Sequence, residues 1–173
     1  MRPVSLAFAA ALVVAISSSP ASAGANFDAF LSGLDHACKS APAFETFWAS
    51  ISERYGYSEG ERPTVVAPAD LAPAFGPIRA IDKGEWVDVS MTLDGTFREL
   101  KLARLAFFVG KENGISGYRV EFAETPARLK AVLGAAVAKG KKQMAAEDTA
   151  EAGITTGFDF KKGASAVFCD FSN

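Results

Sequence analysis

The segment from Trp86 to Phe122 constrains the fold more than any other part of this sequence. Apolar and polar residues alternate along it, and the pairs Asp94-Gly95 and Asn113-Gly114 interrupt the alternation. Such a pair between apolar runs is typical of a tight hairpin, because a type I′ turn needs two residues that tolerate positive φ. The segment therefore predicts three consecutive antiparallel strands, a meander against which the rest of the chain packs.

The first turn sets a register for the meander. With Asp94-Gly95 as a two-residue turn, Val89 faces Leu100 and Val87 faces Leu102. This register gives one apolar face and one face of matched charges, which favours it over a three-residue turn.

The middle strand contains a conflict of parity. Its first apolar residues, Leu100 and Leu102, lie at even positions, whereas the following ones lie at odd positions from Leu105 to Val109. A strand of period two cannot keep both sets on one face. The sequence therefore predicts either a β-bulge near Ala103-Arg104 or burial of both faces.

The first 23 residues have the pattern of a secretory signal peptide. Arg2 gives the positive start, Leu6 to Ile16 the apolar run, and Ala21-Ser22-Ala23 the cleavage site. The apolar run is about half of the roughly 20 residues that a membrane span needs. The sequence predicts a signal peptide at 1–23 and a single α+β domain at 24–173, which is periplasmic or secreted and has no stable membrane insertion after cleavage.

The charge balance restricts the partners. The chain has 18 basic and 20 acidic residues, a net charge of −2, and loss of Arg2 leaves 17 basic residues. This balance argues against a nucleic-acid partner and against strong attraction to anionic lipid.

Two cysteines, Cys38 and Cys169, lie near the two ends of the expected domain. In an oxidising compartment an even number of cysteines indicates a disulfide, and the alternative is two buried free thiols. Two cysteines and the single histidine, His36, do not make a four-ligand metal site. We therefore predict a Cys38–Cys169 bond, with no metal and no cofactor.

Helical spacing of apolar residues occurs three times. The first two sets have the same spacing and are separated by Pro42: Phe27, Phe30, Leu31, Leu34 and Cys38, then Phe44, Phe47, Trp48, Ile51 and Tyr55. A third helix is predicted from Thr125-Pro126 to Gly140.

Two short strands follow at the end of the chain, Ile154 to Phe160 and Ala164 to Phe171. The predicted fold is α+β, with an antiparallel sheet of about five strands, formed by the meander and a C-terminal hairpin. The N-terminal helices and one further helix pack on one face of this sheet.

The segment from Gly56 to Glu85 is rich in proline and glycine and predicts mostly irregular chain, with a short strand at Thr64–Val66 and a helical turn within Ala69–Phe75. So long an irregular segment is often functional, although a solvated connector is the simpler interpretation. The large aromatic and arginine side chains in and beside it are residue types that dominate binding hot spots. The predicted ligand-contact residues are Tyr57, Arg62, Phe75, Arg79 and Trp86.

No residue pattern predicts catalysis. His36 lies off the apolar stripe, no Gly-x-Ser-x-Gly occurs, and a disulfide leaves no thiolate nucleophile. A carboxylate pair is conceivable at two places, but such residues are usually a solvated rim. These places are an acidic rim near the first strand of the meander, formed by Asp82, Glu85 and Asp88, and the end of the third strand, with Glu121 and Glu124.

The sequence thus predicts an exported, non-enzymatic binding module for a protein, peptide or cell-wall glycan ligand, of which an inhibitor of a secreted hydrolase is one form. The alternatives are a small hydrolase that uses the acidic rim, and a scaffold that forms a homodimer through its sheet. An uncovered apolar sheet face would favour the homodimer.

Overall fold

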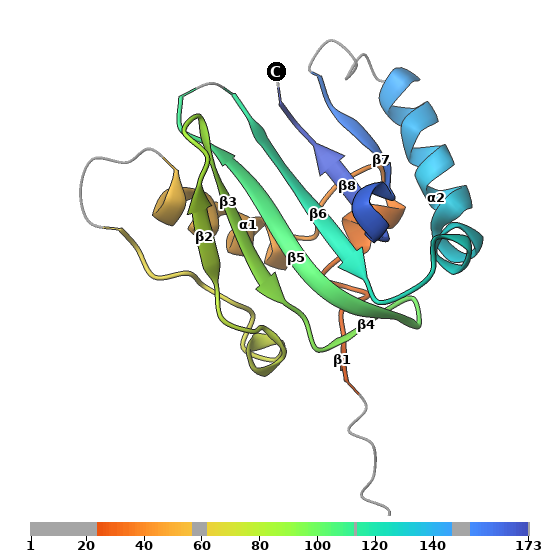
Figure 1. Cartoon of the computed structure of the whole chain (residues 1–173), viewed down its shortest axis with the longest axis horizontal. Helices are drawn as coiled ribbons and strands as arrows, with labels where there is room; N and C mark the ends of the chain where they lie inside the picture. Colours follow the sequence, from red (N-terminus) through yellow and green to blue (C-terminus); the bar gives the residue numbers. More distant parts are fainter. Residues whose placement is uncertain (1–23, 57–61, 113, 147–152, 173) are drawn as a thin grey trace, which may run out of the picture.

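The computed structural model describes residues 24–56, 62–112, 114–146 and 153–172. Within these ranges the chain forms two α-helices and a mostly antiparallel sheet of eight strands (Figure 1). The predicted α+β class is confirmed. The sheet is larger than the predicted five strands. Two short strands, at Ala25–Asn26 and Arg79–Asp82, lie in stretches for which no strand was predicted, and the predicted second strand of the meander is divided in two at Arg98-Glu99.

The elements follow one another in this order: β1 (Ala25–Asn26), the 3-10 turn η1 (Ser32–Asp35), α1 (Pro42–Tyr55), η2 (Ala72–Ala74), β2 (Arg79–Asp82), β3 (Trp86–Thr92), β4 (Gly95–Phe97), β5 (Leu100–Gly110), β6 (Ser116–Phe122), α2 (Pro126–Ala146), β7 (Thr155–Asp159), η3 (Lys161–Gly163) and β8 (Ala166–Asp170).

The long strand β5 is the centre of the sheet. On one side it pairs with β4 and then with β3, which in turn pairs with β2; on the other side lie β6, β8 and β7 in that order. The β5–β6 hairpin and the C-terminal β7–β8 hairpin agree with the sequence prediction, and β8 joins the second hairpin to β6. The pairing of β1 with β4 is parallel.

The predicted turn at Asp94-Gly95 is wrong. Val89 pairs with Phe107 instead of Leu100, and the tight turn lies at Arg98-Glu99, whose φ angles are 49° and 62°. Both residues have the positive φ that a type I′ turn requires. Gly95 is needed for a different reason: a Cβ there would overlap the carbonyl oxygen of Ala25, where β1 passes beside β4.

A β-bulge resolves the parity conflict in β5. The register with β6 shifts between Leu102 and Arg104, as the sequence predicted for one of its two alternatives. Because of this extra residue, Leu102 before the shift and Leu105 and Phe107 after it are all buried.

The predicted first helix is wrong, although its apolar residues are buried as expected. The chain from Phe27 to Cys38 forms turns and the short η1, and it ends with Ala37 and Cys38 at φ of 54° and 62°. Phe27 N–H donates to the carbonyl of Thr96, so pairing with β4 holds the start of this segment in an extended form. Tertiary contacts therefore override the helical spacing.

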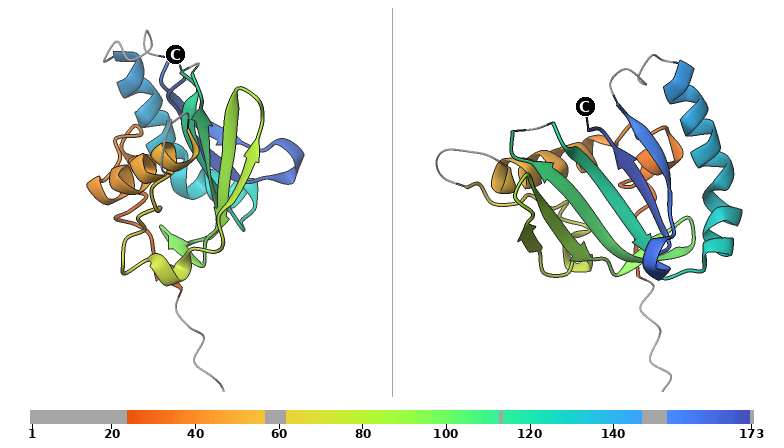
Figure 2. Two further views of the ribbon diagram at one scale, coloured as in Figure 1. Left: turned by 90° about the vertical axis from the view of Figure 1, so that its left-hand side faces the viewer. Right: turned by 45° about the horizontal axis from the view of Figure 1, so that its top comes forward.

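Helix α1 begins at Pro42, as predicted, and packs its apolar side onto the sheet. The rings of Phe44 and Tyr118 lie 4.6 Å apart, and both side chains are buried. Helix α2 begins after Thr125, whose hydroxyl accepts a hydrogen bond from Arg128 N–H. Both helices lie on the same side of the sheet (Figure 2).

Helix α2 does not end at Gly140, as the sequence predicted, but continues to Ala146. Gly140 is buried against the turn that follows η1: a Cβ at this position would lie 3.2 Å from the Cα of Ala37. The glycine thus permits close packing within the helix and is not its C-terminal signal.

The stretch before β2 also differs from the prediction. The helical turn is present as η2, but Thr64–Val66 is not a strand. This part of the chain is attached to α1, because Ser50 Oγ accepts a bond from Val66 N–H and Arg54 donates to the carbonyl of Pro63. The strand in this region is β2, directly before the turn that leads to β3.

The predicted disulfide is confirmed. Cys38 is bonded to Cys169 on β8, and their Cα atoms lie 5.8 Å apart. The bond ties the N-terminal turns to the inner strand of the C-terminal hairpin. The signal peptide at 1–23 lies outside the described residues and stays a prediction, as does the single domain.

Candidate functional site

One face of the sheet is not covered by either helix (Figure 2). On β5 and β6 the side chains of Phe107 and Val120 point to the buried core, so the residues that alternate with them point to the opposite side. We call this second side the open face, and its larger side chains on β5, β6, β7 and β8 are Arg104, Phe108, Arg119, Glu121, Asp159 and Phe168.

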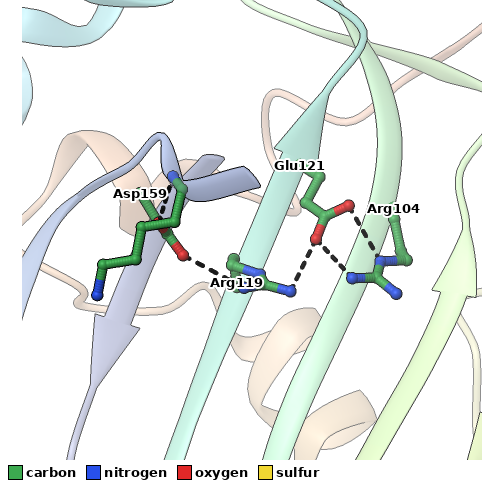
Figure 3. A network of polar contacts seen from close by, with 5 residues as sticks. Arg104, Arg119, Glu121 and Asp159 are labelled. Atoms are coloured by element: carbon green, nitrogen blue, oxygen red, sulfur yellow. Dashed lines mark hydrogen bonds and ion pairs between the residues drawn. The ribbon is translucent and has the colours of Figure 1, made fainter. Parts of the chain in front are cut away.

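Four charged residues form a row across the open face (Figure 3). Glu121 Oε1 lies 2.6 Å from Arg104 Nη2 and 2.8 Å from Arg119 Nη2, and Arg104 Nε donates to Glu121 Oε2 at 3.1 Å. Arg119 Nη1 reaches Asp159 Oδ2 at 3.3 Å. The hydrogen bond with Glu121 raises the pKa of Arg104. The row therefore holds β5, β6 and β7 together from outside the core.

A hollow of about 370 Å³ lies at the Arg119 end of this row. Apolar rings form part of its wall, and charged groups form the rest; its lining is Phe108, Arg119, Phe158, Asp159, Lys161, Phe168, Cys169 and Asp170. The guanidinium of Arg119 lies 6.0 Å from the centre of the Phe108 ring. We call this site the open-face hollow.

Some polar groups that line the open-face hollow have hydrogen-bond partners, and others have none among the described residues. Asp159 accepts from Lys161 N–H and from Arg119, and Asp170 accepts from Ser172 N–H. In contrast, Arg119 Nε is buried and has no partner in the described part of the chain. Lys161 is exposed at the margin of the hollow. Two donor groups of the hollow, the Arg119 Nε–H and the Lys161 side chain, therefore have no hydrogen-bond partner in this part of the chain, while Asp170 keeps acceptor capacity on its carboxylate.

The predicted ligand-contact residues do not form one cluster. Phe75 packs into the core, with its ring centre 5.1 Å from that of Phe47. Arg79 and Trp86 lie on β2 and β3, and alternation places both on the open-face side. Arg62 is exposed and lines a separate hollow beside β2. Tyr57 lies outside the described residues.

The residues of the predicted acidic rim do not face one another. Asp82 pairs with Val87 and Ile81 with Asp88, so the side chains of Asp82 and Asp88 point to opposite faces of the sheet. Asp82 accepts from Lys111 Nζ at 2.7 Å, and this bond lowers its pKa. A lowered pKa keeps the carboxyl ionised, which is the opposite of what a general acid needs.

Other chemistry-bearing groups are separate. His36 is exposed, and its Nδ1 lies 2.8 Å from the carbonyl oxygen of Ser32. Among the residues that the structure describes, no three histidine, cysteine or acidic side chains are placed to hold a metal ion. Over the same residues, no helix is long and apolar enough to cross a membrane.

Sequence reasoning did not find the open-face hollow. Alternation along β6 places Arg119 and Glu121 on the side opposite the core, but alternation alone does not say which polar residues meet. Arg119 meets Asp159 only because β8 lies between β6 and β7 and the hairpin turn brings Lys161 alongside. A signal for this strand order is absent from local sequence.

Comparison of the chain with family models, with curated proteins and with solved structures gives no match. The functional argument therefore depends on the geometry of the chain itself.

Proposed function

We propose that this protein is an exported binding module that recognises a protein, peptide or cell-wall ligand without catalysis, and that the open-face hollow holds a carboxylate of that ligand. An inhibitor of a secreted hydrolase is one form of such a module. The observation that carries the proposal is the pair of cationic side chains that line the hollow: Lys161 is exposed, and Arg119 has a buried Nε with no hydrogen-bond partner in the described part of the chain.

Export is supported by the disulfide, since such bonds persist in oxidising compartments. The signal-peptide pattern at 1–23 points to the same periplasmic or secreted location.

A carboxylate is the group that fits these donors. Arginine and lysine bind carboxylates through charge-assisted hydrogen bonds, which are stronger than neutral ones. The acidic groups in the hollow already accept N–H donors, so they compete only in part for a ligand cation. The rings of Phe108 and Phe168 can contact an apolar group next to the carboxylate. The end of a peptide that carries an apolar side chain has both features.

A pair of small probes tests this proposal. N-acetyl-phenylalanine carries the carboxylate, and N-acetyl-phenylalaninamide lacks it but keeps the ring. We expect the acid to bind and to shift the NMR signals of Arg119 and Lys161, and the amide to bind at least fivefold more weakly. High salt should weaken binding of the acid, because partly exposed charges are screened.

Two lysine variants provide the matched control. Lys161→Ala should weaken binding of the acid about fivefold, which corresponds to roughly 1 kcal/mol for an exposed charged contact. Lys139→Ala removes an exposed lysine from α2 and should leave binding unchanged. Equal binding of the acid and the amide, or equal effects of the two lysine variants, would contradict the proposal.

A further inference from the structure

Strand β2 forms a free edge of the sheet. It pairs with β3 on one side, and no strand of the described residues pairs with its other side. All four of its residues are exposed, including Ile81, whose exposed fraction is 53%. At the opposite end of the sheet, α2 packs beside β7 (Figure 1). An uncovered edge presents unpaired backbone groups to any other extended chain.

The hydrogen-bond pattern identifies which backbone groups point outward. Lys83 N–H donates to the carbonyl of Trp86 at 2.8 Å and closes the β2–β3 hairpin. Bonded and non-bonded pairs alternate along an antiparallel ladder. The pair Ile81–Asp88 is therefore bonded, whereas Ala80–Val89 is not. The N–H and C=O of Ala80 consequently point away from β3, towards solvent.

A second hollow, of about 500 Å³, lies beside this edge on the helix side of the sheet. Ala80 and Asp82 line it from β2, and Tyr55, Arg62 and Lys111 are among its other lining residues. Residues directly opposite each other in a ladder share a face. A residue placed opposite Ala80 on an added strand would therefore point its side chain into this hollow.

We propose that β2 binds an extended, acidic segment of another polypeptide chain, which adds to the sheet as a further strand. In this mode of recognition, hydrogen bonds to the backbone of Ala80 supply affinity. The second hollow supplies specificity, because every second side chain of the added strand points to its side of the sheet. This surface is distinct from the open-face hollow, and it needs a different probe.

Charge selects the acidic partner. The side chains of Arg62, Arg79 and Lys83 are all exposed beside the edge. Lys111 adds a further cation, although it is paired with Asp82. Glu85 in the hairpin turn is exposed as well, so four basic side chains stand against two acidic ones at this edge. A second copy of this chain would bring another basic edge against the first, and like charges facing each other across a ladder are unfavourable. An acidic strand instead meets these cations with opposite charge.

The probe is an acetylated ten-residue peptide of alternating glutamate and threonine, compared with a peptide in which lysine replaces each glutamate. We expect the acidic peptide to shift the NMR signal of the Ala80 amide and to slow its hydrogen exchange. The basic peptide should bind at least tenfold more weakly. Absence of any effect on the Ala80 amide at saturating acidic peptide would overturn the proposal.

Two variants at one position sharpen the test. Ala80→Pro removes the outward N–H without removing a bond to β3, so it should weaken binding at least tenfold. Ala80→Val keeps the N–H, so any loss of binding caused by its larger side chain in the hollow should be smaller than the loss in the proline variant. Undiminished binding to the proline variant would overturn the proposal.

A third variant is used if Ala80→Pro destabilises the fold, and a measurement of molecular mass tests whether the edge binds a second copy of the chain. If Ala80→Pro lowers the melting temperature, Arg62→Glu replaces it, and we then expect the preference between the acidic and basic peptides to decrease or reverse. An unchanged preference would contradict the role of charge. Sedimentation that shows a dimer dissolved by Ala80→Pro would show that a second copy occupies the edge, and would overturn the assigned partner.

Discussion

The two edges of the sheet are protected in different ways. At the β7 edge, α2 packs alongside, and the disulfide attaches the neighbouring strand β8 to the N-terminal turns. At the β2 edge there is only a strand of four exposed residues with charged groups at its ends. Covering an edge and keeping it short and charged both prevent uncontrolled pairing. The second device differs in that it leaves the edge accessible to a suitable partner.

The disulfide and the proposed strand-addition site lie in different parts of the molecule. We call β6, β8, β7, α2 and the disulfide the stapled half, and β2 with β3 the free half. The disulfide lies in the stapled half, where the buried Tyr118 pairs with Cys169, whereas every residue of β2 in the free half is exposed. The open-face hollow is built on strands of this half and so has a rigid frame, whereas the proposed strand-addition site lies on the free half.

The largest expected effect is loss of the disulfide. Cys38→Ala together with Cys169→Ala should lower the free energy of unfolding by up to about 5 kcal/mol, because the bond closes a loop of 131 residues in the unfolded chain. Urea unfolding of the variant and of the native protein, with and without reductant, measures this. A loss below about 1 kcal/mol would show that the disulfide contributes little to the free energy of unfolding.

The second effect is a dependence on alkaline pH. Burial raises the pKa of the Tyr118 hydroxyl above its ordinary value of 10. The folded state thus holds this proton more tightly than the unfolded state, so the stabilisation is complete below pH 10 and is lost as the pH rises further. Urea midpoints at pH 8 and above pH 10 test this.

Tyr118→Phe is the control for that pH dependence. It removes the ionisable group and should flatten the alkaline decline, even if it changes stability at neutral pH. An absorbance titration in which all tyrosines of the folded protein ionise near pH 10 would contradict the assignment.

Two glycines of α2 test how closely the stapled half is packed, and the expected changes in the free energy of unfolding are about 1 kcal/mol. Replacing a glycine by alanine within a helix usually stabilises by about that amount. Gly134→Ala should show this gain, because nothing lies within 4 Å of the new Cβ. Gly140→Ala should lose it, since the methyl group lies 3.2 Å from the Cα of Ala37. Equal gains in the thermal unfolding of the two variants would show that the turn at Ala37 moves away without cost.

The smallest effect is expected on the free half. Ile81→Thr replaces an exposed side chain by another β-branched one and should change the free energy of unfolding by less than about 0.5 kcal/mol. Hydrogen exchange should also separate the halves, with the Ala80 amide exchanging faster than that of Tyr118. A large loss of stability in this variant would mean that β2 is covered in solution.

Local sequence determined the features that depend on neighbouring residues. Pro42 and Thr125 mark the starts of the two helices, and the parity change in β5 predicts a bulge that is present. The even cysteine count, together with the predicted signal peptide, predicts the disulfide that is present. The helix starts and the bulge are predictable because their physical causes, a fixed φ, a capping oxygen and the pleat, are readable from sequence alone.

Only the tertiary structure decided the features that depend on distant contacts. Gly95 had the signature of a turn but serves the approach of β1, and Gly140 had the signature of a helix end but serves the contact with Ala37. The segment from Phe27 to Cys38 has helical spacing, yet pairing with β4 holds its start extended. A glycine signal has more than one cause, and its sequence context does not say which one operates.

The two candidate sites likewise depend on contacts between residues that are far apart in the chain. Arg119, Asp159 and Lys161 meet because of strand order, and the outward amide of Ala80 follows from the ladder with β3. The turn at Gly84, whose φ is 87°, is the local sign of that hairpin that the sequence prediction missed. Strand order is set by the sum of many weak contacts between residues far apart in the chain, so no short stretch of sequence specifies it.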